Sequence, residues 1–392
     1  MIQIKKFHSN DLVTYFISFF LYNFARVLPH AVLTVILLDK GMSIGNIAFI
    51  QSFFMIAVLL FEFPSGILTD IWSEKNIYLI ALFLLAISYF LIMISHSFLI
   101  LCLSWFIYGI SSASISGSLE TYFLKKYQNN EYLMKKFNIN LNNINLISGL
   151  IGGGIGSFIY AYIEDALYVI SILFIIVSAI LIIFFFRSNS KIHSQNNMNF
   201  KNIITELKNI NDKQIYIDIL LFAIFQIIAQ LFFQFWQVMF LSAGINKKQF
   251  GIFYIIFQLI ALFSNFVFGR ITFKKLKPFL IIFISVLLIL GIYFDHVSWV
   301  FVILILLFLL PFNIYSNQLF LDIQKQSPSH ILASVMSFAG TIGSIVSMIF
   351  LWVIGVLDHF QSFDVVAIES IMLFMVLSLI IYYLKKFISV IL

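Results

Sequence analysis

Three charged residues lie within otherwise apolar stretches of this chain: Glu62, Glu120 and Arg26. A charge at membrane depth costs about 3 kcal/mol or more, so it normally faces a partner or a water-filled cavity. A carboxyl group shielded from water holds its proton more tightly, and a nearby arginine reverses that effect. These residue types therefore predict proton coupling by Glu62 and Glu120, with Arg26 tuning them or neutralising an anionic substrate.

The same residues also have a structural interpretation. Arg26 could lock two helices together through a buried ion pair, and Glu120 could pair with Lys125 or Lys126 near the membrane surface. We favour the functional interpretation because ionisable residues inside membrane-spanning segments commonly mark transport pathways.

A polar stripe surrounds Arg26 on its own predicted helix. Asn23, Arg26, His30 and Thr34 follow one another at spacings of 3, 4 and 4 residues, which places them on one helical face. Pro29 lies beside them and removes a backbone hydrogen bond. We expect Asn23, Arg26 and His30 to line a substrate cavity, and histidine also titrates near neutral pH.

A second polar face is predicted on the helix at 214–242. Its glutamines recur at spacings of 4, 4 and 3 residues and are Gln226, Gln230, Gln234 and Gln237. Lipid offers amides no partners, so this face must meet other helices or water. Packing through interhelical hydrogen bonds is one explanation. We favour a cavity wall, to which Trp236 would add an apolar ring.

Two asparagines extend the predicted polar lining. Asn313 and Asn317 lie one turn apart just after Pro311, where the helix is expected to kink. The predicted substrate-binding residues are therefore Asn23, Arg26, His30, Gln226, Gln230, Gln234, Trp236, Asn313 and Asn317.

Membrane-spanning helices are the elements that must position these residues. The chain is 62% hydrophobic and 10% charged, with a mean hydropathy of +1.05, which excludes a soluble globular protein. Apolar stretches of about twenty residues, the length that spans a bilayer, recur throughout. The twelve predicted helices are 12–37, 44–69, 77–95, 98–124, 139–163, 166–187, 214–242, 250–269, 278–295, 299–321, 331–355 and 366–386. The predicted class is an all-α integral membrane protein.

Basic residues are distributed unevenly between the two sides that these helices define. The side with both termini carries nineteen lysines and arginines, whereas the other carries only Lys40, Lys247 and Lys248. Basic residues are retained on the cytoplasmic side of membranes, so both termini are predicted to be cytoplasmic. The net charge of +6 therefore reflects topology rather than nucleic-acid binding.

The helices divide into two pseudo-symmetric halves of six, predicted at 1–187 and 214–392. Between them, 188–213 is a predicted cytoplasmic linker that includes an amphipathic helix. At a constant offset of 203 residues, Gly41 matches Gly244 and Glu62 matches Asn265. Parallel repeats of this kind are typical of transporters that bind substrate at the membrane midplane between the halves.

The segment from Glu62 to Lys75 resembles the helix 2–3 loop signature of the major facilitator superfamily. The matching residues are Gly66, Leu68, Asp70 and Lys75, whereas Ile71, Ser73 and Glu74 replace usual residues of the signature. This resemblance implies twelve helices and alternating access. It also implies that Asp70 is part of a cytoplasmic latch that helps to set the conformational equilibrium.

The segments 62–66 and 116–120 resemble a branch with many bacterial exporters of drugs and lipophilic compounds. That resemblance implies a bacterial cytoplasmic membrane and proton-coupled efflux. Trp105 replaces the helix 4 arginine of many proton-coupled antiporters, and the glycine run at 149–156 lacks their proline. Any coupling must then use another group.

We therefore predict a secondary active transporter, not an enzyme, that exports a hydrophobic or amphipathic small molecule in exchange for protons. Its expected partners are that molecule, protons and membrane lipids, with no nucleic acid, and it is expected to be a monomer. The sequence has no Gly-x4-Gly-Lys-Ser/Thr loop and no cluster with metal-site spacing, so no cofactor or metal is expected. The main alternative is uptake or facilitated transport of an anionic solute at Arg26. A transferase for lipid-linked substrates and a receptor or immunity protein that only sequesters a ligand are weaker alternatives.

Overall fold

The computed structural model describes residues 10–71, 73–116, 118–127, 130–187, 213–270, 276–327 and 332–391. Within these ranges the chain is helical and forms two compact units. The first comprises residues 1–196 and 247–255, and the second comprises 197–246 and 256–392. The predicted amphipathic helix of the linker lies outside the described residues.

The helices of the first unit are α2 (Asn10–Val27), α3 (Leu33–Asp39), α4 (Ile44–Ile71), α5 (Glu74–Ile94), α6 (Phe98–Ser116), α7 (Leu119–Tyr127), α8 (Glu131–Ile163) and α9 (Leu167–Phe185). Those that follow are α11 (Lys213–Ser242), α12 (Phe250–Phe268), α13 (Lys277–Tyr293), α14 (Ser298–Gln326), α15 (Leu332–Leu357) and α16 (Phe363–Ile391). Short 3₁₀ turns, η1 (Glu164–Ala166) and η2 (Lys247–Gln249), precede α9 and α12.

Every predicted span has a counterpart among these helices. Nine segments of the described residues are long and apolar enough to cross a membrane, and one of them, Tyr132–Phe185, combines α8 and α9. The shorter apolar helix α13 accounts for one further span. The pair α2 and α3 accounts for the last.

Two of the predicted helices are broken, which corrects the prediction of single continuous spans. The span predicted at 12–37 ends at Val27 and resumes at Leu33, because Pro29 cannot continue the hydrogen-bond ladder. The span predicted at 98–124 is divided between α6 and α7. The sequence there is Ser-Gly-Ser, which has low helix propensity.

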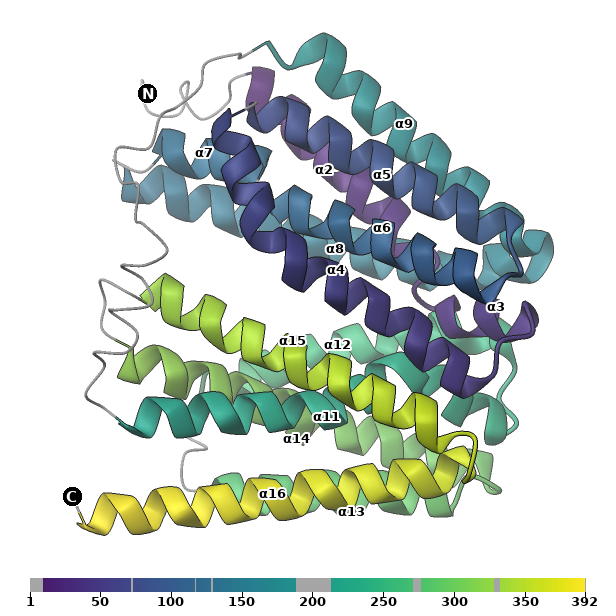
Figure 1. Cartoon of the computed structure of the whole chain (residues 1–392), viewed down its shortest axis with the longest axis vertical. Helices are drawn as coiled ribbons and strands as arrows, with labels where there is room; N and C mark the ends of the chain where they lie inside the picture. Colours follow the sequence, from purple (N-terminus) through teal and green to yellow (C-terminus); the bar gives the residue numbers. More distant parts are fainter. Residues whose placement is uncertain are drawn as a thin grey trace. The chain divides into compact units, whose positions relative to one another are not determined.

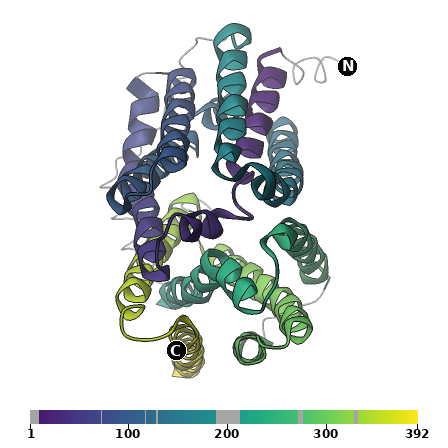
Figure 2. The ribbon, with the colours of Figure 1, turned by 90° about the vertical axis from the view of Figure 1, so that its right-hand side faces the viewer.

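Several equivalent helix pairs pack against each other in both units (Figure 1, Figure 2). In the first unit α2 packs against α8 and α9, and α5 packs against α6 and α9. In the second unit α11 packs against α15 and α16, and α13 packs against α14 and α16. The repeat suggested by the 203-residue offset therefore extends to these helix pairs, whereas the packing of α4 against α6 has no comparable counterpart between the described residues of α12 and α14.

The loop after the first span of each unit has the same backbone structure. Gly41 and Gly244 adopt φ values of 82° and 76°, a left-handed conformation that favours glycine. The amide of Met42 donates to Leu37 at 3.1 Å, and that of Ile245 donates to Phe240 at 2.9 Å. A bond of this kind, from the residue after a left-handed glycine back to the last helical turn, is typical of the Schellman motif that ends helices.

Candidate functional site

The break after α2 frees a backbone carbonyl that a tyrosine satisfies. The amide of His30 donates to the Val27 carbonyl at 2.9 Å, one residue later than in a continuous α-helix. The carbonyl of Arg26 instead accepts a hydrogen bond from the Tyr89 hydroxyl at 3.1 Å. Because lipid offers backbone groups no partner, this bond from α5 allows the helix to break within the bundle.

The polar side chains at this break converge on a second tyrosine. Arg26 Nη2 donates to Asn23 Oδ1 at 3.4 Å, and the Arg26 side chain also hydrogen-bonds Tyr108. His30 Nε2 lies 3.4 Å from the Tyr108 hydroxyl. The structure thus brings together the predicted Asn23, Arg26 and His30, although His30 lies in the turn rather than on one continuous helix.

Sequence reasoning missed Tyr89 and Tyr108. Their rings meet edge to face, with centroids 5.9 Å apart, and both are buried. The sequence contains 17 tyrosines, so a tyrosine within an apolar helix gives no signal by itself. Only the packing of α5 and α6 against the end of α2 identifies these two.

Arg26 forms no ion pair with any carboxylate whose side chain the structure describes. The side chains of Glu62 and Asp70 lie outside that part of the chain, so their proposed roles stay predictions. Glu120 is half-buried, and it has no ion pair within the described ranges. Lys125 instead lies 3.6 Å from Glu74.

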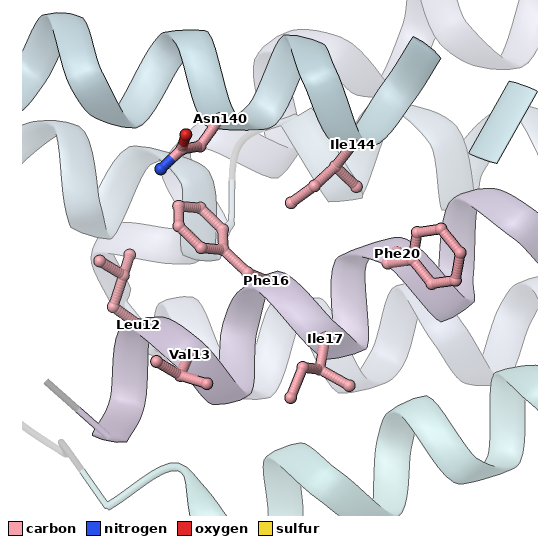
Figure 3. A pocket seen from close by; sticks show the side chains of 7 residues that line it. All are labelled: Leu12, Val13, Phe16, Ile17, Phe20, Asn140 and Ile144. Carbon is pink, nitrogen blue, oxygen red and sulfur yellow. The ribbon is translucent and has the colours of Figure 1, made fainter. Parts of the chain in front are cut away.

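An apolar pocket of about 430 Å³ lies on the same helix, before the polar stripe (Figure 3). It is lined by Leu12, Val13, Phe16, Ile17 and Phe20 of α2 and by Asn140 and Ile144 of α8. The Asn140 amide is the single polar side chain among these seven. Its volume falls within the range of about 300–1,000 Å³ typical of small-molecule sites, and its lining suits an apolar molecule.

The predicted glutamine face of α11 is held together by hydrogen bonds. Gln234 Nε2 donates to Gln230 Oε1 at 3.0 Å, and Gln230 Nε2 donates to Ser347 Oγ of α15 at 3.3 Å. A methyl group added at Gly343 would lie 3.3 Å from Gln226 Cγ, so α15 approaches this face closely. Part of the glutamine face therefore serves helix packing, the alternative that the sequence left open.

The other predicted residues of the second unit differ in their surroundings. Trp236 is buried in an aromatic cluster, with ring centroids 5.3 Å from Phe240 and 5.1 Å from Phe257. Asn313 Nδ2 donates to the Leu309 carbonyl of its own helix at 2.8 Å. Asn317 Nδ2 donates to Asn265 Oδ1 of α12 at 2.7 Å, which links α14 to the repeat counterpart of Glu62.

A buried network of charges, which sequence reasoning also missed, joins four helices of the second unit. Its charged members are Asp218 (α11), Lys277 (α13), Asp322 (α14) and Lys385 (α16). Lys277 pairs with Asp322 and lies 4.0 Å from Asp218, which also accepts a hydrogen bond from Lys385 at 2.5 Å. The Asp218 side chain is fully buried.

Two amides complete this network. Gln326 Nε2 donates to Asp218 Oδ2 at 2.5 Å, and Gln318 Nε2 donates to Asp322 Oδ1 at 2.9 Å. With two carboxylates and two ammonium groups, the charges balance. Such an arrangement is stable only while every member has its partner.

Comparison with known proteins identifies the fold. The sequence profile of the Major Facilitator Superfamily matches residues 15–351. The structure of a mutant of the nucleoside transporter NupG superposes with a TM-score of 0.76 at 14% identity, covering 96% of this chain and 99% of that one. No curated protein matches the sequence.

Two further solved structures are similar over nearly their whole length. The D-xylose-proton symporter has a TM-score of 0.71 at 12% identity, covering 94% of this chain and 96% of that one. The POT family transporter PepTSo has a TM-score of 0.72 at 13% identity, covering 96% and 97%. Identities this low show a shared fold and leave the substrate undetermined.

Proposed function

Because the chain belongs to the major facilitator superfamily, whose members of known structure above are transporters, we propose that it is a secondary active transporter exporting a hydrophobic or amphipathic small molecule in exchange for protons. The observation that supports this substrate class is the arrangement on α2. There, an apolar pocket of about 430 Å³ precedes the cluster of Asn23, Arg26 and His30. An amphipathic molecule needs both surfaces.

Each unit contributes residues to this proposal. In the first, Asn23, Arg26 and His30 contact the substrate and Glu62 and Glu120 carry the proton, with Asp70 in the latch. In the second, Gln226, Gln230, Gln234, Trp236, Asn313 and Asn317 provide further contacts. The two six-helix halves, 1–187 and 214–392, move as bodies in a bacterial cytoplasmic membrane, with both termini cytoplasmic and the protein monomeric.

Transport by purified protein in liposomes tests the proposal directly. A pH gradient is imposed in either direction, and the uptake of fluorescent amphipathic compounds is measured with and without a protonophore. We expect movement against the compound's gradient, driven by protons. Glu62→Gln should reduce driven movement at least tenfold. A tenfold lower rate corresponds to an activation free energy higher by about 1.4 kcal/mol.

The matched control is Glu164→Gln, which removes an exposed carboxylate between α8 and α9. It should transport like the wild-type protein. Transport that ignores the proton gradient, or that Glu62→Gln leaves unchanged, would contradict proton coupling through this residue.

One observation favours the alternative of anion transport: Arg26 has no carboxylate partner among the described residues. A thermal-stability screen separates the two functions, because a ligand at 100 times its Kd stabilises a protein by about 2.7 kcal/mol. Stabilisation by organic anions alone, lost in Arg26→Ala and retained in Glu62→Gln, would replace the export proposal with anion transport.

A further inference from the structure

A carboxylate outside the polar stripes lies in an apolar groove of the second unit. The groove has a volume of about 380 Å³ and is formed by α11, α15 and α16. Its acidic residue is Glu369, which is exposed and belongs to a helix apolar enough to cross the membrane. An ionisable residue in such a helix needs a partner, because lipid cannot solvate its charge.

Nothing in the described part of the chain provides that partner. The Glu369 carboxylate makes no ion pair or hydrogen bond with a described side chain. The other polar lining residue, Ser370, already donates to the Val366 carbonyl at 2.6 Å. The remaining lining is aliphatic or aromatic, so the groove combines one uncompensated negative charge with a large apolar surface.

The apolar surface extends on both sides of the carboxylate along the helices. On α15 it follows one face from Val346 to Leu357, a length of about 16 Å at 1.5 Å per residue. Glu369 lies six residues after the start of α16 at Phe363, or about 9 Å from that end of the bundle. Because only the short loop 358–362 separates the end of α15 from the start of α16, we infer that the carboxylate lies between the two ends of this stripe.

The groove is open rather than covered by other helices of its own unit. Ile349, Val353 and Leu373, which line it, are 50%, 46% and 49% exposed. A molecule dissolved in the bilayer can therefore enter it sideways. A lipid head group is a poorer fit, because its charge is at one end of the molecule and at the membrane surface, whereas this carboxylate has apolar surface on either side.

We propose that this groove binds a membrane-dissolved organic amine whose ammonium pairs with Glu369 and whose apolar groups extend along α15 in both directions. A charge-assisted hydrogen bond away from water supplies the specificity. The aliphatic wall supplies the hydrophobic contribution, and its volume lies within the range of small-molecule sites. The site does not depend on the proposed transport: binding here is expected even if the chain moves no substrate.

Binding of dihexylamine to the purified protein in an uncharged detergent tests this proposal. Dihexyl ether has nearly the same shape without the charge, so it controls for partition into detergent and for apolar contact. We expect the wild-type protein to bind the amine about tenfold more tightly than the ether, the factor given by one charged hydrogen bond. In Glu369→Gln the two compounds should bind alike.

Two further variants keep the test decisive. Asp364→Asn removes an exposed carboxylate of the same helix that does not line the groove, so it should keep the preference for the amine. Val353→Trp fills the groove and should weaken both compounds while leaving the carboxylate in place. Both positions are exposed, so neither change is expected to prevent folding.

Three results would overturn the proposal. The first is equal binding of the amine and the ether to the wild-type protein. The second is a preference for the amine that persists in Glu369→Gln. The third is displacement of the amine by phosphatidylethanolamine but not by phosphatidylglycerol, which would assign the groove to a lipid ammonium instead. None of these outcomes bears on whether Glu62→Gln abolishes transport.

Discussion

The 203-residue offset assigns four positions of the second unit to four of the first, and their chemistry differs. Asp218, Lys277, Asp322 and Lys385 correspond to Tyr15, Glu74, Leu119 and Ile182. In the second unit these positions form the buried ion-pair network. In the first, Tyr15 stacks on Phe123 with ring centroids 5.2 Å apart, and no carboxylate occupies the place of Asp218.

Around the place of Asp218, neutral hydroxyls provide the polar contacts of the first unit, whereas Glu74, at the place of Lys277, lies 3.6 Å from Lys125. Ser18 Oγ lies 3.1 Å from the Tyr78 hydroxyl and 2.7 Å from Ser178 Oγ, which joins α2, α5 and α9. The corresponding helices of the second unit are joined by charges. The comparison teaches that one helical framework accepts two kinds of polar connection, which differ in what the loss of a single group costs. A neutral bond in a membrane bundle contributes about 0.6 kcal/mol, whereas breaking a buried ion pair costs about 3–5 kcal/mol.

The largest expected effect comes from breaking the charged network. Asp218→Asn leaves Lys277 and Lys385 without their shared carboxylate, and the uncompensated buried charge should lower the free energy of unfolding by about 3–5 kcal/mol. Denaturant titration in mixed micelles measures this change. Lys325→Met, which removes an exposed lysine close to the network in sequence, should have little effect.

Removing two opposite charges together sharpens the same comparison. Lys277→Met with Asp322→Leu leaves Asp218 paired with Lys385, so the double variant should be more stable than either single variant. If the two destabilisations simply add, the network is not a coupled unit, and the contrast with the first unit is wrong.

An intermediate effect is expected where the two units are alike. Gly41→Ala and Gly244→Ala each place a side chain on a left-handed residue, so each should cost about 1–2 kcal/mol, and the two costs should be similar. Thermal unfolding of the purified variants measures both. Gly149→Ala and Gly340→Ala are matched controls inside helices, where a methyl group meets no atom within 4 Å. Markedly unequal costs at 41 and 244 would show that the loops are not equivalent.

The smallest effect is expected from the neutral connection. Tyr78→Phe removes the hydroxyl that meets Ser18 and should cost about 0.6 kcal/mol. The same denaturant titration is used, with Tyr132→Phe at a 61% exposed position as the control. A loss as large as that of Asp218→Asn would remove the distinction between the units.

The helices could be predicted from the sequence because hydropathy and length identify membrane spans directly. The breaks within these helices were harder to predict. Pro29 indicates that the helix is interrupted nearby, but it does not determine the residue at which α2 ends. Helical spacing grouped Asn23, Arg26 and His30 correctly, although α2 ends before His30, whereas Tyr108 belongs to another helix and carries no charge. Periodicity within one helix cannot identify a partner on another.

The charged network escaped prediction for a related reason. Asp218, Asp322 and Lys385 lie near helix ends, where charges normally face water at the membrane surface. Their burial depends on four helices meeting at one place, and the sequence of any one helix does not show this. The groove around Glu369 was not predicted either, because it forms only when α15 and α16 pack against α11.

The matched helix ends at Gly41 and Gly244 have a consequence for the origin of the chain. A segment with an even number of spans begins and ends on the same side of the membrane, so a tandem copy inserts in the same orientation without any change in its loops. Duplication of one six-span ancestor would leave such paired glycines. Both glycines keep a left-handed backbone that other residues adopt only at a cost, while the buried side chain at the place of Asp218 differs between the two units.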